Sequence, residues 1–178
     1  MEETERLESE RLYLRPLETG DREAIFRLIN HDRDVLRYYV AEYLENEEEL
    51  PIERMIASFE KTGKHIFAIV LKENDEVIGN IFQCSGPDRF MNSSEVGYAI
   101  GKEYWNQGYM SEALKLMIAF LFGKGIHKVS ACHIEENKAS GRVMEKCGMT
   151  YEGKRIDELY YHGKYHDTLH YFIINKEE

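Results

Sequence analysis

The segment from residue 110 to residue 122 limits the possible folds of this chain more than any other part of the sequence. Between Met110 and Phe122, apolar side chains would occupy nearly every side of a helix, and Lys115 is the main exception. A helix that is apolar all round is one that the rest of a protein encloses. We therefore expect this helix to be largely buried.

Periodicity assigns the other elements of the chain. Alternating or continuous apolar runs predict strands at residues 11–15, 65–71, 77–82, 95–100 and 128–134, and a final pair within 151–174 around the turn at 162–164. Apolar residues at helical spacing predict helices at 21–30, 52–59 and 137–147. The charged stretch 45–49 is expected to be a solvated loop or helix start. The order β-αα-βββ-α-β-α-ββ is that of an α+β domain with a mixed sheet.

Composition excludes several classes of protein. The 178 residues carry 33 acidic against 23 basic side chains, and this net charge of −10 argues against a nucleic-acid partner. The acidic start has no apolar signal segment, and no apolar run approaches the ~20 residues of a membrane-spanning helix. Three cysteines without a C-x-x-C pair favour a reduced, cytoplasmic protein. With no repeat or linker, residues 1–178 are expected to form a single domain.

The short stretch before the central helix raises a question of function. Strand 95–100 is followed by a loop containing Gly108, and the helix begins directly after it. The first N–H groups of a helix have no partner within the helix, so such a site can hold a phosphate. A plain turn is the simpler interpretation of one glycine. The P-loop and G-x-G-x-x-G motifs are both absent from the sequence.

Three blocks in order give a more specific indication: Gly97 to Ile100, Tyr104 to Ala113, and Asn137 to Ser140 with Glu145 to Met149. Together they resemble the GNAT superfamily of N-acetyltransferases, and in particular its ribosomal-protein N-terminal acetyltransferase branch. The resemblance runs from about Arg11 to Ile174. It implies a mixed, mostly antiparallel central sheet flanked by helices, acetyl-CoA as co-substrate, and a homodimer.

The resemblance also implies where coenzyme A binds. The family's phosphate loop corresponds to Asn106, Gln107, Gly108, Tyr109, Met110 and Ser111. Trp105 and Met110 depart from the family pattern, which has Gln or Arg and then Gly or Ala at these positions, and Met110 could narrow the approach to the phosphates. The edge formed by Tyr98, Ala99 and Ile100 would pair with the pantetheine arm, beside a gap between that strand and strand 128–134.

Acetyl transfer to an amine needs a base, an oxyanion site and a proton for the thiolate. Glu95 is the candidate base, although a solvated glutamate on a half-exposed strand is an equal alternative. A backbone N–H near Tyr98 or Ala99 could bind the oxyanion.

The resemblance makes Ser140 the acid that protonates the thiolate, with Asn137 ordering it or contacting the cofactor. The structural alternative is that Asn137 is a helix N-cap and that the Ser140 hydroxyl reciprocates the cap. Tyr98 and Tyr151 remain other proton donors.

A metal site is not expected. His162, His166 and His170 recur every fourth residue, but the turn at 162–164 places them on strands and not on one helical face. Cys132 and Cys147 are expected to be small core residues and not nucleophiles.

The leading interpretation is therefore an acetyl-CoA-dependent N-acetyltransferase acting by direct transfer to a primary amine. A protein N-terminus, a polyamine or an aminoglycoside would each suit an acidic entrance, which Tyr38, Tyr39, Glu42 and Tyr43 could line. A non-catalytic CoA-binding domain and a site for a different nucleotide are the alternatives.

Overall fold

The computed structural model describes residues 6–176 and contains one continuous sheet of eight strands in the order β1-β2-β3-β4-β5-β6-β8-β7. The strands are β1 (Leu7–Glu8), β2 (Leu12–Pro16), β3 (Ile66–Leu71), β4 (Val77–Ser85), β5 (Ser93–Ile100), β6 (Lys128–Ile134), β7 (Thr150–Tyr161) and β8 (Lys164–Ile174). All neighbours are antiparallel except β5 and β6, which are parallel. The sheet is thus mixed and mostly antiparallel, as predicted.

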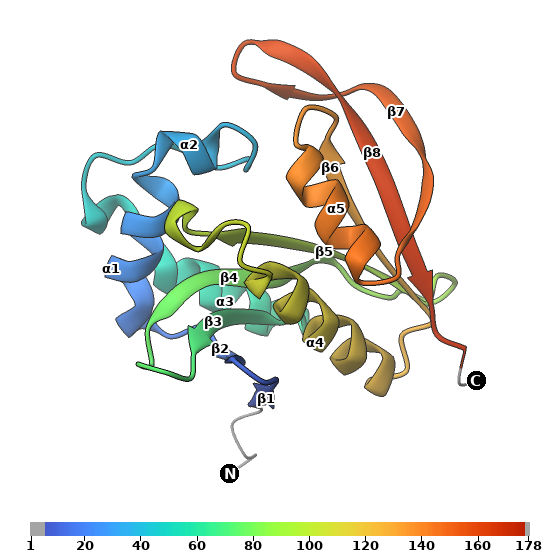
Figure 1. The fold of residues 1–178 in the computed structure, drawn as a ribbon, viewed down its shortest axis with the longest axis horizontal. Coiled ribbons are helices and arrows are strands. Elements are labelled where there is room, and N and C mark those ends of the chain that lie inside the picture. Colours follow the sequence, from blue (N-terminus) through green and yellow to red (C-terminus); the bar gives the residue numbers. More distant parts are fainter. Residues whose placement is uncertain (1–5, 177–178) are drawn as a thin grey trace.

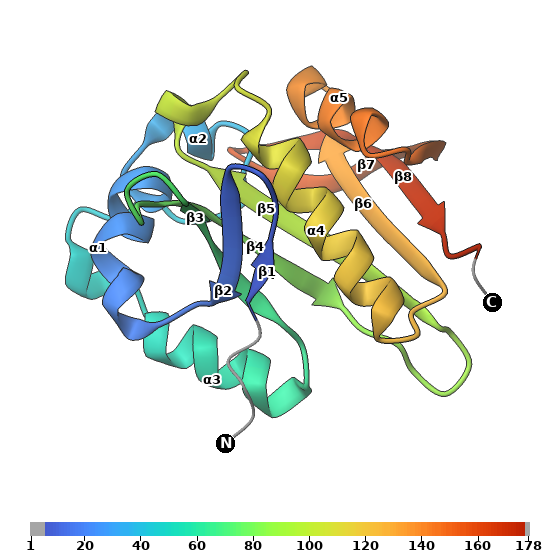
Figure 2. The same cartoon turned by 60° about the horizontal axis from the view of Figure 1, so that its bottom comes forward.

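Helices cover both faces of the sheet (Figures 1 and 2). They are α1 (Arg22–Ile25), which continues as a π-helical turn over Phe26–Asn30, α2 (Arg33–Leu36), α3 (Ile52–Thr62), α4 (Tyr109–Gly123) and α5 (Lys138–Lys146). One hydrophobic core lies under α4 and α5 and the other under α1 to α3. None of the helices in residues 6–176 has the length and hydropathy needed to cross a membrane.

The predicted order of elements is confirmed, with two short additions. Strand β1, which has two residues, and helix α2, which has four, were not predicted from the sequence. Neither is long enough to show a hydrophobic period. The charged stretch 45–49 contains a single 3₁₀ turn at Glu47–Glu49, and the helix after it extends to Thr62, where Gly63 ends it with a positive φ of 64°.

Helix α4 is the central helix that the apolar run predicted. Its inner residues, from Met110 to Leu121, pack in the larger core against the sheet. The alternation predicted for β5 is also present, because Val96 and Ile100 join this core while Ala99 belongs to the core on the other face. Strand β5 therefore contributes side chains to both hydrophobic cores.

Strands β5 and β6 diverge after a short contact. Only Ser93 to Glu95 pair with Lys128 to Ser130, whereas β5 remains paired to β4 as far as Ile100 and β6 remains paired to β8 as far as Ile134. The edge of β5 from Val96 onward consequently faces an opening in the sheet. The candidate site is built around this opening.

Candidate active site

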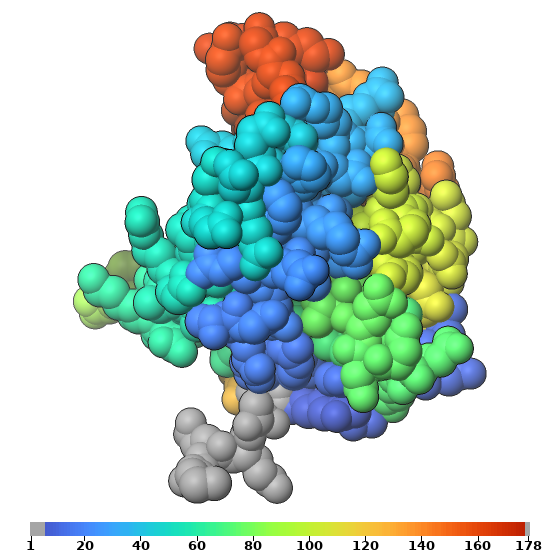
Figure 3. Space-filling model, turned by 90° about the vertical axis from the view of Figure 1, so that its left-hand side faces the viewer, coloured from blue at the N-terminus to red at the C-terminus, as the bar shows by residue number. Residues whose placement is uncertain are grey.

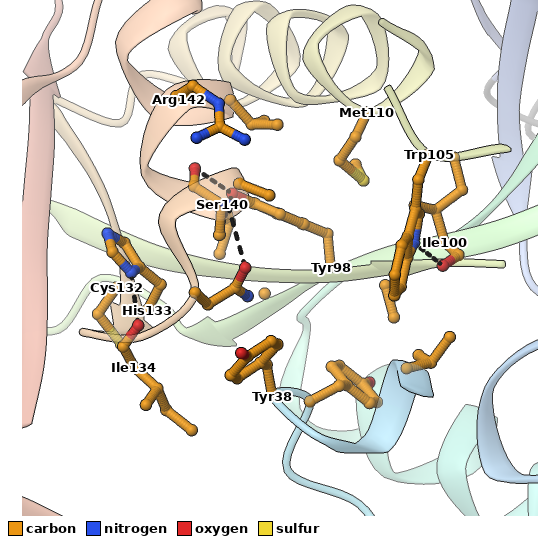
Figure 4. Close-up of a pocket in the computed structure, with 18 of the residues that line it drawn as sticks. Tyr38, Tyr98, Ile100, Trp105, Met110, Cys132, His133, Ile134, Ser140 and Arg142 are labelled. Atoms are coloured by element: carbon orange, nitrogen blue, oxygen red, sulfur yellow. Dashed lines mark hydrogen bonds between the residues drawn. The ribbon is translucent and has the colours of Figure 1, made fainter. Parts of the chain in front are cut away.

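A cavity of about 580 Å³ passes through the opening between β5 and β6. On one side it is lined by the start of α4 and by α5, and on the other by the segment after α2 and by residues of β4, β7 and β8. Figure 4 shows Met110 and Arg142 on the α4 and α5 side of β5 and Tyr38 on the opposite side. We call these two parts the cofactor end and the acceptor end.

The cofactor end contains backbone N–H groups without protein partners. Gly108 is the N-cap of α4 with a φ of 85°, and Asn106 also has a positive φ, of 60°. No side chain caps this helix, and within residues 6–176 no protein group accepts a hydrogen bond from the N–H groups of Tyr109 to Ser111. Free amides and the helix dipole make this a place where an anion is stabilised.

The side chains of the phosphate loop divide into two groups. Asn106, Gly108, Met110 and Ser111 line the cavity, whereas Gln107 and Tyr109 do not. The Gln107 amide donates to the Glu103 carbonyl at 2.8 Å, and Tyr109 lies under the guanidinium of Arg11. Of these two residues, only the backbone is therefore in a position to contact a ligand. The Met110 side chain is 7% exposed and packs in the larger core, so it does not cover the helix end.

Two cations complete the cofactor end. Arg142 and Lys146 on α5 line the cavity, and neither forms an ion pair with any residue in the described part of the chain. They add positive potential beside the free amides of α4.

The open edge of β5 offers fewer groups than the sequence predicted. A Cβ added to Gly79 would clash with the carbonyl oxygen of Ala99, so the Ala99 peptide faces β4 and those of Tyr98 and Ile100 face the opening. The Ile100 carbonyl already accepts a hydrogen bond of 3.0 Å from the indole of Trp105. Among the three predicted edge residues, Tyr98 alone retains both backbone groups for a ligand.

Tyr98 and Ser140 meet in the middle of the cavity (Figure 4). Their hydroxyl oxygens are 2.8 Å apart, and either can be the donor. Burial raises the pKa of Tyr98, so this phenol stays protonated. Asn137 caps α5 by accepting the Ser140 N–H at 3.3 Å, but the Ser140 hydroxyl turns to Tyr98 and does not reciprocate the cap.

Glu95 lies behind the wall of the cavity and is not one of the residues that line it. Its Oε1 accepts a contact of 3.8 Å from the Cys132 thiol, which does line the cavity. Burial and the charge of Glu95 raise the pKa of Cys132 to about 12 and that of Cys84 to about 11. Both thiols are therefore protonated, and Cys132 is no nucleophile. Its thiol can pass a proton between the cavity and the Glu95 carboxylate, or shield that carboxylate from the cavity.

A second carboxylate at the acceptor end was not singled out from the sequence. Glu158 Oε2 is 2.8 Å from His170 Nε2 and accepts a hydrogen bond from Thr168, while Glu158 Oε1 accepts one of 2.6 Å from Arg155. Partial burial opposes ionisation, but the hydrogen bonds from Thr168, Arg155 and His170 lower the pKa of Glu158 to about 2. Polar residues at every second position of β8, His166, Thr168 and His170, were the signal for a polar face here.

The acceptor end is aromatic and apolar. Tyr38 and Tyr39 line it as predicted, together with Val35, Val40, Phe82 and Leu159. Glu42 and Tyr43 do not line it: Glu42 is exposed, and the Tyr43 ring stacks on His31 and lies under Arg33. The prediction of an acidic entrance formed with Glu42 is therefore wrong.

A hydrogen-bonded contact holds this wall in place. The Tyr161 hydroxyl, near the tip of the β7–β8 hairpin, is within 2.9 to 3.1 Å of the carbonyl oxygens of Leu36, Tyr39 and Ala41. His162 Nε2 adds a contact of 3.1 Å to the Leu36 carbonyl. In Figure 3 the red hairpin tip rests directly on the light-blue segment that follows α2.

The three regularly spaced histidines have separate partners. His162 contacts the Leu36 carbonyl, His166 the Tyr161 carbonyl and His170 the Glu158 carboxylate. No group of three potential ligands within residues 6–176 could hold a metal ion.

Comparisons with known proteins agree with this geometry. Residues 11–150 match the model of the acetyltransferase (GNAT) domain family. The uncharacterized N-acetyltransferase YoaA of Bacillus subtilis is 31% identical and covers 97% of this chain and 98% of its own length.

Two solved structures share the fold. RimL, a ribosomal L7/L12 alpha-N-protein acetyltransferase in complex with coenzyme A, aligns with a TM-score of 0.86 at 20% identity over 98% of this chain and 100% of its own. Spermidine N-acetyltransferase from Vibrio cholerae, in complex with CoA and spermine, aligns with a TM-score of 0.79 at 24% identity over 92% and 95% of the two chains. The chain described here belongs to the GNAT acetyltransferase family and is an N-acetyltransferase.

Proposed function

We propose that this enzyme moves the acetyl group of acetyl-CoA directly to a primary amine, on a protein N-terminus or a small molecule, within a ternary complex. The support is the cavity itself, which joins an anion-binding end to an apolar end through the opening between β5 and β6. Two substrates that enter from opposite faces of the sheet can meet at that opening without a covalent enzyme intermediate.

The proposed position of coenzyme A follows from the polar groups of the cofactor end. The diphosphate accepts hydrogen bonds from the free amides between Asn106 and Ser111, and Arg142 and Lys146 neutralise phosphate charge. The pantetheine arm then runs along the open edge of β5, where the Tyr98 carbonyl accepts a hydrogen bond from it and the Tyr98 N–H stays free for the thioester oxygen. This places the thioester beside the Tyr98 and Ser140 hydroxyls.

The proposed chemistry uses groups around that point. A protonated amine gives its proton through water to Glu95, which lies behind Cys132. The free amine nitrogen then attacks the thioester carbonyl, and the N–H of Tyr98 stabilises the oxyanion. As the C–S bond breaks, the Ser140 hydroxyl, paired with Tyr98, protonates the thiolate of coenzyme A, and the proton that the attacking nitrogen loses on becoming an amide restores the Ser140 hydroxyl. Asn137 holds the Ser140 backbone in position.

The free amides at the start of α4 are the observation that carries this proposal, and a ligand panel tests it. Coenzyme A should stabilise the protein against thermal unfolding more than ATP or NAD does, because only coenzyme A fills the opening as well as the anion site. Equal stabilisation by ATP or NAD would indicate a site for another nucleotide. Acetyl-CoA consumption with a panel of amines, followed by intact-mass detection, then tests turnover. Tight CoA binding without turnover would indicate a non-catalytic domain.

We also propose a cytoplasmic location. The support is that Cys84, Cys132 and Cys147 are all free thiols, as in proteins of reducing compartments. Fractionation of cells that express the tagged chain tests the location, and recovery from a membrane or secreted fraction would contradict it.

A further inference from the structure

The wall of the acceptor end has an unusual charge distribution for an enzyme that takes cationic amines. The segment after α2 supplies Tyr38 and Val40, β4 supplies Phe82, and the hairpin supplies Leu159. Among the described residues that line the whole cavity there is no aspartate or glutamate. Within residues 6–176, the fully charged side chains that line it are Arg142 and Lys146, at the opposite end.

Two carboxylates, Glu158 and Glu95, contact residues on or beside this wall without lining the cavity themselves. Glu158 is already neutralised, because Arg155 forms an ion pair of 2.6 Å with it and His170 contacts its other oxygen. Glu95 forms no ion pair with any residue in the described part of the chain, and its side-chain contact is the neutral Cys132 thiol. Arg155 also interacts electrostatically with Glu95, so the two carboxylates share one guanidinium and the acceptor end faces the charge of one carboxylate that is not compensated.

One uncompensated carboxylate matches one ammonium group. A second ammonium group on the same substrate would lie among aromatic and aliphatic side chains with no counter-charge, and burying an unpaired charge is costly. An alkyl or aromatic group, in contrast, would gain from contact with the same wall. We infer that the acceptor is an amine with a single ammonium group carried on an aliphatic or aromatic group, and not a polyamine. This inference rests on the proposed acetyl transfer.

The wall is also held in place, so its aromatic and aliphatic side chains do not easily withdraw from the acceptor. Tyr161 and His162 bind the carbonyls of Leu36, Tyr39 and Ala41 across the gap between the hairpin and the segment after α2. Tyr39 is itself buried deeply enough that its pKa is raised. The apolar side chains of the acceptor end are therefore held in these positions in the folded protein.

A matched pair of amines tests this inference with the full-length chain. Hexylamine and 1,6-diaminohexane have the same carbon chain and differ by one ammonium group. We expect kcat/KM to be roughly tenfold higher or more for hexylamine, since the diamine must bury an unpaired charge. An equal or higher kcat/KM for the diamine, or for spermidine, would overturn the inference.

Two tripeptide amides, Ala-Val-Phe and Ala-Lys-Lys, extend the comparison to protein N-termini. Faster acetylation of the apolar peptide supports the inference. If hexylamine is at the same time a poor substrate, the result identifies the acceptor amine as the N-terminus of a polypeptide. Faster acetylation of the lysine-containing peptide contradicts it.

Binding separates this inference from the proposed reaction. Calorimetric titration of each amine into CoA-saturated protein measures the preference even if nothing is acetylated. Preferential binding of hexylamine without turnover would defeat the proposed reaction and keep the inference. Tighter binding of the diamine, or no binding of either amine or of the apolar peptide, would overturn the inference.

A variant should weaken or remove the preference. Val40 lines the acceptor end and is 54% exposed, so Val40→Asp adds a carboxylate there without emptying the core. We expect it to raise the diamine-to-monoamine ratio of kcat/KM roughly tenfold by supplying the missing counter-charge. Ile156→Asp is the control, because Ile156 is on the hairpin, is 76% exposed and does not line the cavity. An equal shift in both variants would show a general charge effect and contradict the inference.

Discussion

The two ends of the cavity are built from different parts of the chain. At the cofactor end, the groups that face a ligand are mainly backbone amides, and most come from the continuous stretch between β5 and the first turn of α4. At the acceptor end they are side chains from the segment after α2, from β4 and from the β7–β8 hairpin. The cofactor end depends on local backbone geometry, whereas the acceptor end depends on how distant segments pack.

The largest effect is expected at the cofactor end, from Gly108→Val. Gly108 has a φ of 85°, and an added Cβ would lie 3.3 Å from Arg11 Nη2. A β-branched residue is strained there by ~1–2 kcal/mol and would displace the amides that follow. We expect CoA affinity to fall about 100-fold, as measured by calorimetry, because several charge-assisted hydrogen bonds are lost.

Gly125→Val is the matched control for that variant. Gly125 lies just after α4 with a φ of 81° and has similar backbone strain, but it is at the far end of the helix and its Cβ would meet nothing within 4 Å. It should lose stability while its CoA affinity stays normal. Equal losses of affinity in both variants would mean that strain, and not the anion site, explains the result.

Glu95→Gln tests the boundary between the two ends. Removing the proposed base should lower kcat about 100-fold or more and leave the CoA dissociation constant unchanged. Steady-state kinetics across pH, together with calorimetry, measure both quantities. Glu42→Gln is the control, since Glu42 is exposed and lies outside the cavity. Unchanged kcat in Glu95→Gln would remove this residue from the mechanism.

A smaller effect is expected from the hydroxyl pair. Ser140→Ala and Tyr98→Phe each leave one hydroxyl near the thioester, so we expect each to lower kcat about tenfold. The double variant shows whether the two can replace each other. If they can, the double loss exceeds the product of the single losses, whereas a double loss equal to that of Ser140→Ala makes Tyr98 only a positioning residue. Loss of CoA binding in either single variant would place the pair in binding and not in catalysis.

The contrast between the ends explains what the sequence could predict. The burial of α4 and the loop before it follow from residues that are neighbours in the chain, and the periods of the long strands gave the correct order of elements. The contact of Trp105 could not be predicted in this way, because nothing in the sequence shows that its indole N–H donates a hydrogen bond to the Ile100 carbonyl.

The acceptor end was less predictable for a physical reason. Tyr38 and Tyr43 are five positions apart in an irregular segment, where no period fixes side-chain direction, and only Tyr38 faces the cavity. On β7 the pairing register shifts between Arg155 and Leu159, and Asp157 has a φ of 51°. This bulge interrupts the alternation of faces, so the direction of Glu158 could not be read from strand spacing.

The smallest expected effect belongs to the acceptor end, from Glu158→Gln. The pKa of Glu158 is about 2 in the folded protein, below its ordinary value of 4.5, so the ionised carboxylate stabilises the fold above pH 4.5. That contribution is lost as the pH falls from 4.5 toward 2. Urea unfolding at several pH values should therefore show Glu158→Gln less stable than the original chain at pH 7, with the difference in unfolding free energy shrinking below about pH 4.5. Glu152→Gln is the control for a simple ion pair, because Glu152 is on the same strand as Glu158 and pairs with Lys128 of β6. A Glu158→Gln difference that stays constant with pH would show that the carboxylate acts by shape and not by charge, and the acceptor end would then lose one of the two carboxylates that distinguish it from the cofactor end.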